Sequence, residues 1–187
     1  MRATLVILVA AILLGIEQAA KVPLAIGNTS ITPSFVIPLV VFVALFAPPV
    51  AALWTALLIG LVVDLATVWG NGVTELVVVG PTALGYLAGA YLVLTVRALL
   101  YRRNPITLMA MSVLASLLAS LVFVAIHSIR MIYTDAYTFA GLTELGHRTL
   151  ASVYTGAIGL VLAFALFPMM PLFGFHDPRE RRFGARK

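Results

Sequence analysis

The chain has 187 residues, of which 62% are hydrophobic and only 10% are charged. A soluble globular domain contains about 45–50% apolar and about 25% charged residues, so this composition excludes a compact soluble protein and indicates an integral membrane protein. There are no cysteines, which excludes disulfides and thiolate metal sites. The net charge of +5 does not indicate a nucleic-acid partner, because the basic residues lie between apolar segments and at the C-terminus, where they set membrane topology.

Six apolar segments are candidates for helices that cross a bilayer, which takes about 20 residues each. In chain order they are residues 3–20, 34–47, 50–68, 76–96, 105–129 and 149–168. We therefore predict an all-α integral membrane protein. Its compact bundle of six transmembrane helices forms a single domain over residues 1–175, followed by a basic cytoplasmic tail over 176–187. The second segment is short and contains Pro38, so it is either a tilted short span or a re-entrant segment, which would leave five spans.

The basic residues predict the orientation of the bundle. If both termini are cytoplasmic, the outer segments contain only Lys21, Arg130 and Arg148. The inner segments then contain the other nine: Arg2, Arg97, Arg102, Arg103, Arg179, Arg181, Arg182, Arg186 and Lys187. This bias follows the positive-inside rule and predicts a multi-pass membrane protein with both termini in the cytoplasm. The first segment could be mistaken for a secretory signal, but its apolar run is long for one, so we expect an uncleaved span.

Small residues recur about every four positions on several of the predicted spans. Such stripes allow another backbone to approach closely, either within the bundle or on a partner's transmembrane helix. The first span is the best candidate for partner docking, because its stripe is the longest and Glu17 lies close to that face. The stripes are Ala11, Gly15 and Ala19 on the first span, Gly85 and Gly89 on the fourth, Ser112, Ser116 and Ser120 on the fifth, and Ser152, Gly156 and Gly159 on the sixth.

Four ionisable residues fall at a similar outer depth on three of the predicted helices: Asp64 on the third, Glu17 on the first, and His127 and Arg130 at the end of the fifth. A charge inside a span is costly, so the face with Asp64 and Gly60 should point into the bundle. One interpretation is structural: Arg130 pairs with Asp64 or with Glu17 and holds the helices in register. The other is a polar pocket that binds a small molecule or a partner segment.

The outer segment from Met131 to Arg148 is long, polar and aromatic. It is interpreted either as an anchor at the level of the lipid headgroups or as a lid over the outer pocket. An enzyme is not predicted, because the chain has neither a metal-ligand spacing such as HxxxH nor a glycine-rich phosphate loop. No metal or cofactor is expected.

The stretch from Pro33 to Leu92 carries a family resemblance. "PSFVIPLVVFVALFAPPVAALWTALLIGLVVDLA", followed by "GPTALGYLAGAYL", resembles the rod shape-determining protein MreD family. Members show a proline before a short apolar span, a glycine-rich span that ends in GLxxDL, and a later span with GYLxG. In this chain the matching positions are Pro33, Gly60, Leu61, Asp64, Leu65, Gly85, Tyr86, Leu87 and Gly89.

This resemblance implies a non-enzymatic inner-membrane component of the bacterial cell-elongation complex. Its partners would be the single-span protein MreC and, directly or indirectly, a SEDS-family glycosyltransferase and a class B penicillin-binding protein that build lateral-wall peptidoglycan, with MreB on the cytoplasmic side. The family is also similar in fold to the S-components of energy-coupling factor transporters. That kinship supplies the alternative function, a substrate-binding protein for uptake of a vitamin or metal ion.

Overall fold

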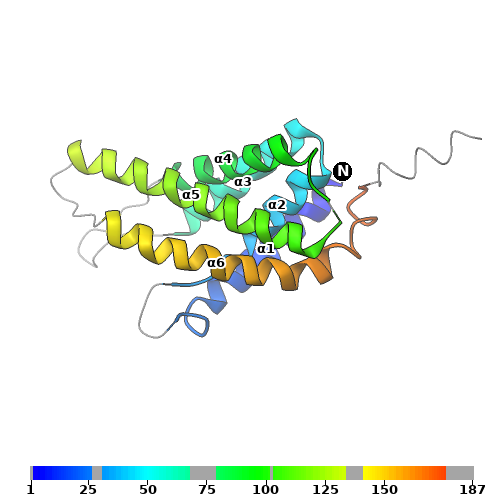
Figure 1. Cartoon of the computed structure of the whole chain (residues 1–187), viewed down its shortest axis with the longest axis horizontal. Helices are drawn as coiled ribbons and strands as arrows, with labels where there is room; N and C mark the ends of the chain where they lie inside the picture. Colours follow the sequence, from blue (N-terminus) through cyan, green and yellow to red (C-terminus); the bar gives the residue numbers. More distant parts are fainter. Residues whose placement is uncertain (1, 27–30, 68–78, 102, 134–140, 176–187) are drawn as a thin grey trace, which may run out of the picture.

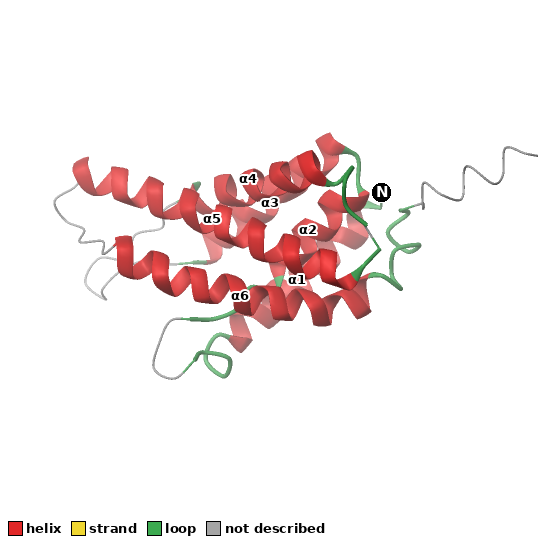
Figure 2. Ribbon diagram, in the orientation of Figure 1, coloured by secondary structure: helices red, strands yellow, loops and turns green. Residues whose placement is uncertain are grey.

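The computed structural model describes residues 2–26, 31–67, 79–101, 103–133 and 141–175, with side chains omitted for 131–133. Within these ranges the fold is all-helical (Figures 1 and 2). The helices are α1 (Ala3–Ala20), α2 (Val36–Phe46), α3 (Pro49–Ala66), α4 (Pro81–Val96), α5 (Pro105–Tyr133) and α6 (Gly141–Leu166). The predicted tail over 176–187 lies outside the described residues, as do residues 134–140 of the predicted lid.

Helix α2 forms the centre of the bundle. Its sequence, VIPLVVFVALF, is apolar on every face, as expected of a helix surrounded by others. All of its residues from Val36 to Leu45 are buried, and it packs against α1, α3, α4, α5 and α6. Pro38 lies in the first turn, where its missing N–H removes no helical hydrogen bond. At about 1.5 Å per residue, α2 is about 16 Å long, about half the hydrocarbon thickness of a bilayer.

The two longest helices, α5 and α6, lie side by side along the length of the bundle, and α4 packs on the other side of α5 (Figure 1). Glycines allow these close approaches. A Cβ on Gly85 would lie 2.9 Å from the carbonyl oxygen of Ala119, and one on Gly156 would lie 2.3 Å from a methyl carbon of Val113. Backbone contact of this kind replaces the hydrophobic driving force that is missing between helices in lipid.

One end of the bundle, which we call the terminal end, holds both ends of the described chain. There the backbone N–H of Arg2 donates to the carbonyl of Phe173 at 3.0 Å (Figure 1). Residues 167–175 turn back over the C-terminal end of α2, and their rings pack around Phe42, with centroid separations of 5.6 Å to Phe173 and 5.8 Å to Phe175. The opposite end, which we call the cavity end, carries the first turns of α2, α4 and α6.

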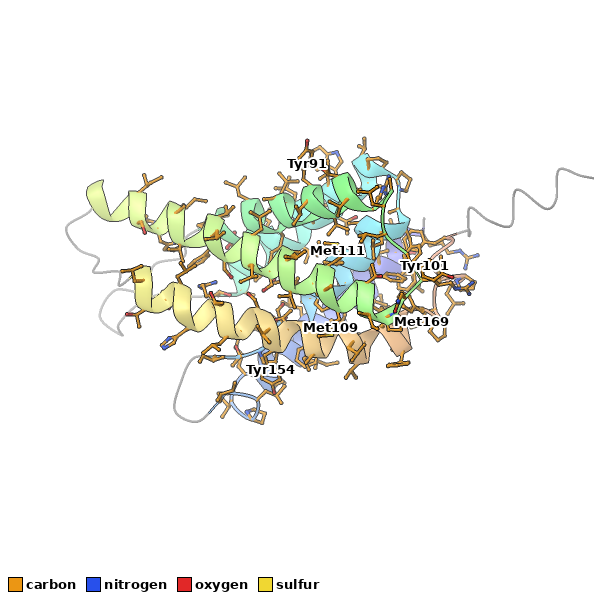
Figure 3. All side chains as sticks on the ribbon, in the orientation of Figure 1. Tyr91, Tyr101, Met109, Met111, Tyr154 and Met169 are labelled. Carbon is orange, nitrogen blue, oxygen red and sulfur yellow. The ribbon has the colours of Figure 1, made fainter. Side chains whose placement is uncertain are left out.

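Apolar side chains cover the outside of the bundle. Tyr91 is 65% exposed, whereas Met111, labelled with it in Figure 3, is only 4% exposed. Helix α1 is the extreme case, because only Val6 and Leu13 of its residues are buried. An apolar groove of about 190 Å³ runs between α1 and α3 and is lined by Ile7, Ala10, Ala11, Leu14, Leu58, Ile59 and Val62.

The predicted segments are largely confirmed as helices. Of the described helices, α1, α3, α5 and α6 are long and apolar enough to cross a membrane, while α2 and α4 are shorter. The chain is therefore a multi-pass membrane protein, and the count of six spans stays a prediction. Two predicted starts were wrong: α4 begins at Pro81 rather than 76, and α6 begins at Gly141 rather than 149. The first residues of α6 are polar, so the apolar pattern used to predict the span began only after them. The predicted outer segment 131–148 is in fact helical over 131–133 and 141–148.

Candidate functional site

The buried helix α2 has a charged side chain at each end. At its N-terminus, Oε2 of Glu17 accepts hydrogen bonds from the Ser34 hydroxyl at 2.9 Å and from the backbone N–H groups of Phe35 at 2.7 Å and Val36 at 3.1 Å. At its C-terminus, Arg97 donates to the carbonyls of Ala44 at 3.1 Å and Ala47 at 2.8 Å. An anion at the N-terminus and a cation at the C-terminus both complement the helix dipole. These contacts satisfy backbone groups that water cannot reach.

Asp64 performs the same task for α4. Its Oδ2 accepts from the backbone N–H groups of Gly80 at 2.8 Å and Ala83 at 3.1 Å, and its Oδ1 accepts from Thr82 at 3.1 Å. The remaining residue of this turn, Pro81, has no N–H to satisfy. Asp64 is only 4% exposed. The carboxylate near the end of α3 is thus a cap supplied by one helix to the first turn of the next.

The local sequence around this cap fits its geometry. Gly80 has a φ of +122°, a conformation that residues with a Cβ rarely adopt. A Cβ on Gly60 would lie 2.5 Å from the Cα of Ala83, so α3 and α4 touch through their backbones one turn below Asp64. This close approach brings the short aspartate side chain within reach of the α4 N–H groups.

A polar cavity of about 180 Å³ lies beside these two caps at the cavity end. It is lined by residues from all six helices and from the segment before α2. The lining consists of Glu17, Thr32, Ser34, Ile37, Val63, Thr67, Thr82, Tyr86, Ser116, Ala119, Ser120, Phe123, Arg148, Ala151 and Thr155. Glu17 and Arg148 are the charged members, on α1 and α6.

Hydrogen bonds between helices fix several of the hydroxyl groups in this wall. The Ser34 backbone N–H donates to Oγ1 of Thr155 at 2.9 Å. Ser116 on α5 donates to Ser152 on α6 at 2.9 Å, and Ser152 donates to the carbonyl of Arg148 at 2.8 Å. The cavity therefore has a wall of ordered polar groups between membrane-spanning helices.

Arg148 is held in the cavity wall by an ion pair with Glu144 and by a cation–π contact with Phe123. Its Nε lies 2.7 Å from Oε1 of Glu144, one turn earlier on α6, and its guanidinium lies 3.7 Å from the centre of the Phe123 ring. Phe123 also stacks on His127 with ring centres 4.0 Å apart. His127 is 1% exposed, and its Nδ1 lies 3.0 Å from the carbonyl oxygen of Phe123. His127 thus reaches the cavity only through Phe123.

The predicted outer cluster is rearranged in the structure. Among the described residues, Arg130 forms an ion pair with neither Asp64 nor Glu17, because both carboxylates face helix N-termini. The basic residue of the cavity is Arg148, which sequence reasoning placed in an outer loop. The spacing of Glu144 and Arg148, four residues apart, was the signal that could have extended α6 and found it.

The predicted small-residue stripes fall into two groups. Gly60, Gly85, Gly89, Gly156 and Gly159 meet neighbouring helices in the bundle. The stripe on α1 does not: Ala11, Gly15 and Ala19 are exposed, and a Cβ on Gly15 would meet nothing within 4 Å. Of the serines, Ser116 and Ser120 line the cavity, whereas Ser112 is buried against Gly159.

Comparison with known proteins gives one family. The family model described as rod shape-determining protein MreD matches residues 1–174. Searches of curated proteins and of solved structures each gave no match. The match spans every described helix.

Proposed function

Because the chain belongs to the rod shape-determining protein MreD family, we propose that it is a non-enzymatic component of the bacterial cell-elongation complex. In this role it binds an MreC-like single-span protein in the inner membrane and helps to regulate the SEDS glycosyltransferase and class B penicillin-binding protein of lateral-wall synthesis. Both termini lie in the cytoplasm, on the side of MreB. The family match over residues 1–174 is the observation that carries this proposal.

The surface of α1 supports a place for the single-span partner. Its small-residue stripe is exposed, a Cβ on Gly15 would meet nothing within 4 Å, and Ala11 also lines the apolar groove between α1 and α3. A partner helix could approach this stripe at backbone distance, which gives transmembrane pairs their packing energy. We therefore assign the α1 face and this groove to the MreC-like helix.

The test is copurification from a bacterial membrane. The tagged chain is extracted in mild detergent, and the proteins recovered with it are identified and quantified. The wild-type chain should recover an MreC-like protein and the wall synthases. Ala11→Leu should reduce recovery about tenfold, the effect of about 1.4 kcal/mol of lost packing.

A matched control is available on another helix. Ala157 is also an exposed alanine of a long helix, on α6, and Ala157→Leu should leave recovery unchanged. Equal recovery with both variants would reject the α1 face as the docking site. Recovery of paired ATPases and a coupling subunit in place of an MreC-like protein would overturn the proposed function and favour the transporter alternative.

A further inference from the structure

The polar cavity is lined by polar side chains beyond the carboxylates that cap α2 and α4. Its volume of about 180 Å³ corresponds to about six water molecules at about 30 Å³ each. That is smaller than sites for drug-sized ligands, which start at about 300 Å³. A small polar group fits it.

The Glu17 side of the cavity offers an acceptor. All three hydrogen bonds that cap α2 go to Oε2. Glu17 lines the cavity, and Oε1 of its carboxylate accepts no hydrogen bond from the described residues. One oxygen therefore serves the fold, while the other can accept from a bound donor.

The Arg148 side of the cavity offers positive charge. The guanidinium is fixed in the wall by Glu144 and by the face of Phe123, so little conformational entropy is lost when an anion binds there. The cavity thus presents a carboxylate and a guanidinium from two different helices.

The side chain of Ser120 adds a hydrogen-bonding group to the cavity wall. Ser120 is 6% exposed and lines the cavity, and it makes no hydrogen bond to the described residues. Its hydroxyl group can therefore bond to a molecule in the cavity without breaking a bond within the bundle.

We propose that the cavity binds a small zwitterionic group, with a primary ammonium donating to Oε1 of Glu17 and a phosphate or carboxylate facing Arg148. Two sources carry this chemistry: a free molecule such as an amino acid, and the headgroup of phosphatidylethanolamine.

The first experiment measures binding of soluble probes to the full chain in phosphatidylcholine nanodiscs. Phosphoethanolamine and glycine carry the ammonium, whereas phosphocholine has the same phosphate but no N–H donor. Calorimetric titration should give phosphoethanolamine or glycine a dissociation constant at least about tenfold lower than phosphocholine, as expected for the loss of one charge-assisted hydrogen bond. The second experiment compares thermal stability in nanodiscs of phosphatidylethanolamine and of phosphatidylcholine, which tests the lipid as the source.

Variants of the wall make the test specific. Ser120→Ala should weaken binding about fivefold or more, and Ala151→Phe, which fills the cavity, should abolish it. Ser112→Ala is the control: the same residue type on the same helix, 0% exposed and outside the cavity, and its hydroxyl group has no hydrogen-bond partner among the described residues. It should bind as wild type. Folding of each variant is checked by its helical circular dichroism.

Each outcome decides the proposal. Binding of the soluble ammonium probes, lost in Ala151→Phe, supports a free ligand. Stabilisation by phosphatidylethanolamine alone, also lost in Ala151→Phe, supports the lipid headgroup. If no probe binds and the two lipids stabilise equally, the cavity holds water only and the proposal is wrong. Equal effects of Ser120→Ala and Ser112→Ala would overturn it too. None of these results depends on whether an MreC-like protein copurifies. The proposed function and the proposed ligand site can therefore fail independently of each other.

Discussion

Replacing Asp64 by asparagine tests the cap between α3 and α4 with almost no change in shape. The aspartate accepts three backbone hydrogen bonds, two at Oδ2 and one at Oδ1. Asparagine keeps one acceptor oxygen and replaces the other by an NH₂ group, which can only donate. Its best orientation keeps the bonds from Gly80 and Ala83 and places NH₂ against the N–H of Thr82.

The expected loss follows from these three contacts. The orphaned buried N–H of Thr82 costs about 1–3 kcal/mol. The two surviving bonds lose their charge assistance, which lowers each by about 1 kcal/mol. We therefore expect Asp64→Asn to lower the free energy of unfolding by about 3–5 kcal/mol. That is a large share of the about 5–15 kcal/mol that a folded protein has.

The assay is reversible unfolding in mixed micelles by titration with a denaturing detergent, followed by circular dichroism. Membrane insertion should be unchanged, because removing a charge does not oppose it. Glu144→Gln is the control: it also neutralises an acid, but in an α6 ion pair whose side chains are both 25% exposed. Such a pair contributes about 0–1 kcal/mol. A loss below about 1 kcal/mol for Asp64→Asn, or equal losses for both variants, would refute the cap as the role of Asp64.

Two further substitutions test the packing of the same bundle by the same unfolding assay. Arg97→Gln should cost about 1–3 kcal/mol, because the charge-assisted bonds to the C-terminal carbonyls of α2 are weakened; an unchanged unfolding midpoint would argue against this cap. Gly60→Ala should destabilise by about 1–3 kcal/mol because its Cβ meets the Ala83 backbone at 2.5 Å. Gly146→Ala on α6, with nothing within 4 Å, should instead stabilise by about 0.5–1 kcal/mol; the opposite ranking of the two alanines would show that helix propensity outweighs contact.

Hydropathy and proline positions were sufficient to predict most helices. The first segment was predicted over 3–20 and is observed as Ala3–Ala20, and the fifth begins at Pro105 as predicted. Both features act locally: apolar runs must be covered by lipid or protein, and proline is tolerated in a first turn. The spacing of the spans also predicts a shared depth for Glu17 and Asp64, which stays a prediction.

The partners of those carboxylates could not be predicted from spacing. A sequence shows which charges need compensation, but not whether a cation or a set of backbone N–H groups supplies it. The choice depends on where the short helices begin in space. The Gly80–Pro81 pair was the available signal, because proline at a first helical position marks a helix start close to the end of α3. Arg97 had no such signal, since its partners lie about 50 residues away in sequence.

The two caps also bear on how the chain enters the membrane during synthesis. Glu17 precedes the N–H groups that it will satisfy on α2, and Asp64 precedes those on α4. Each short helix therefore leaves the ribosome after the acceptor for its first turn has already been made. Helices α1 with α2, and α3 with α4, can be released into lipid as prepaired hairpins, so a short helix does not face the hydrocarbon with bare N–H groups. The order of residues along the chain is thus itself part of what makes such short helices insertable.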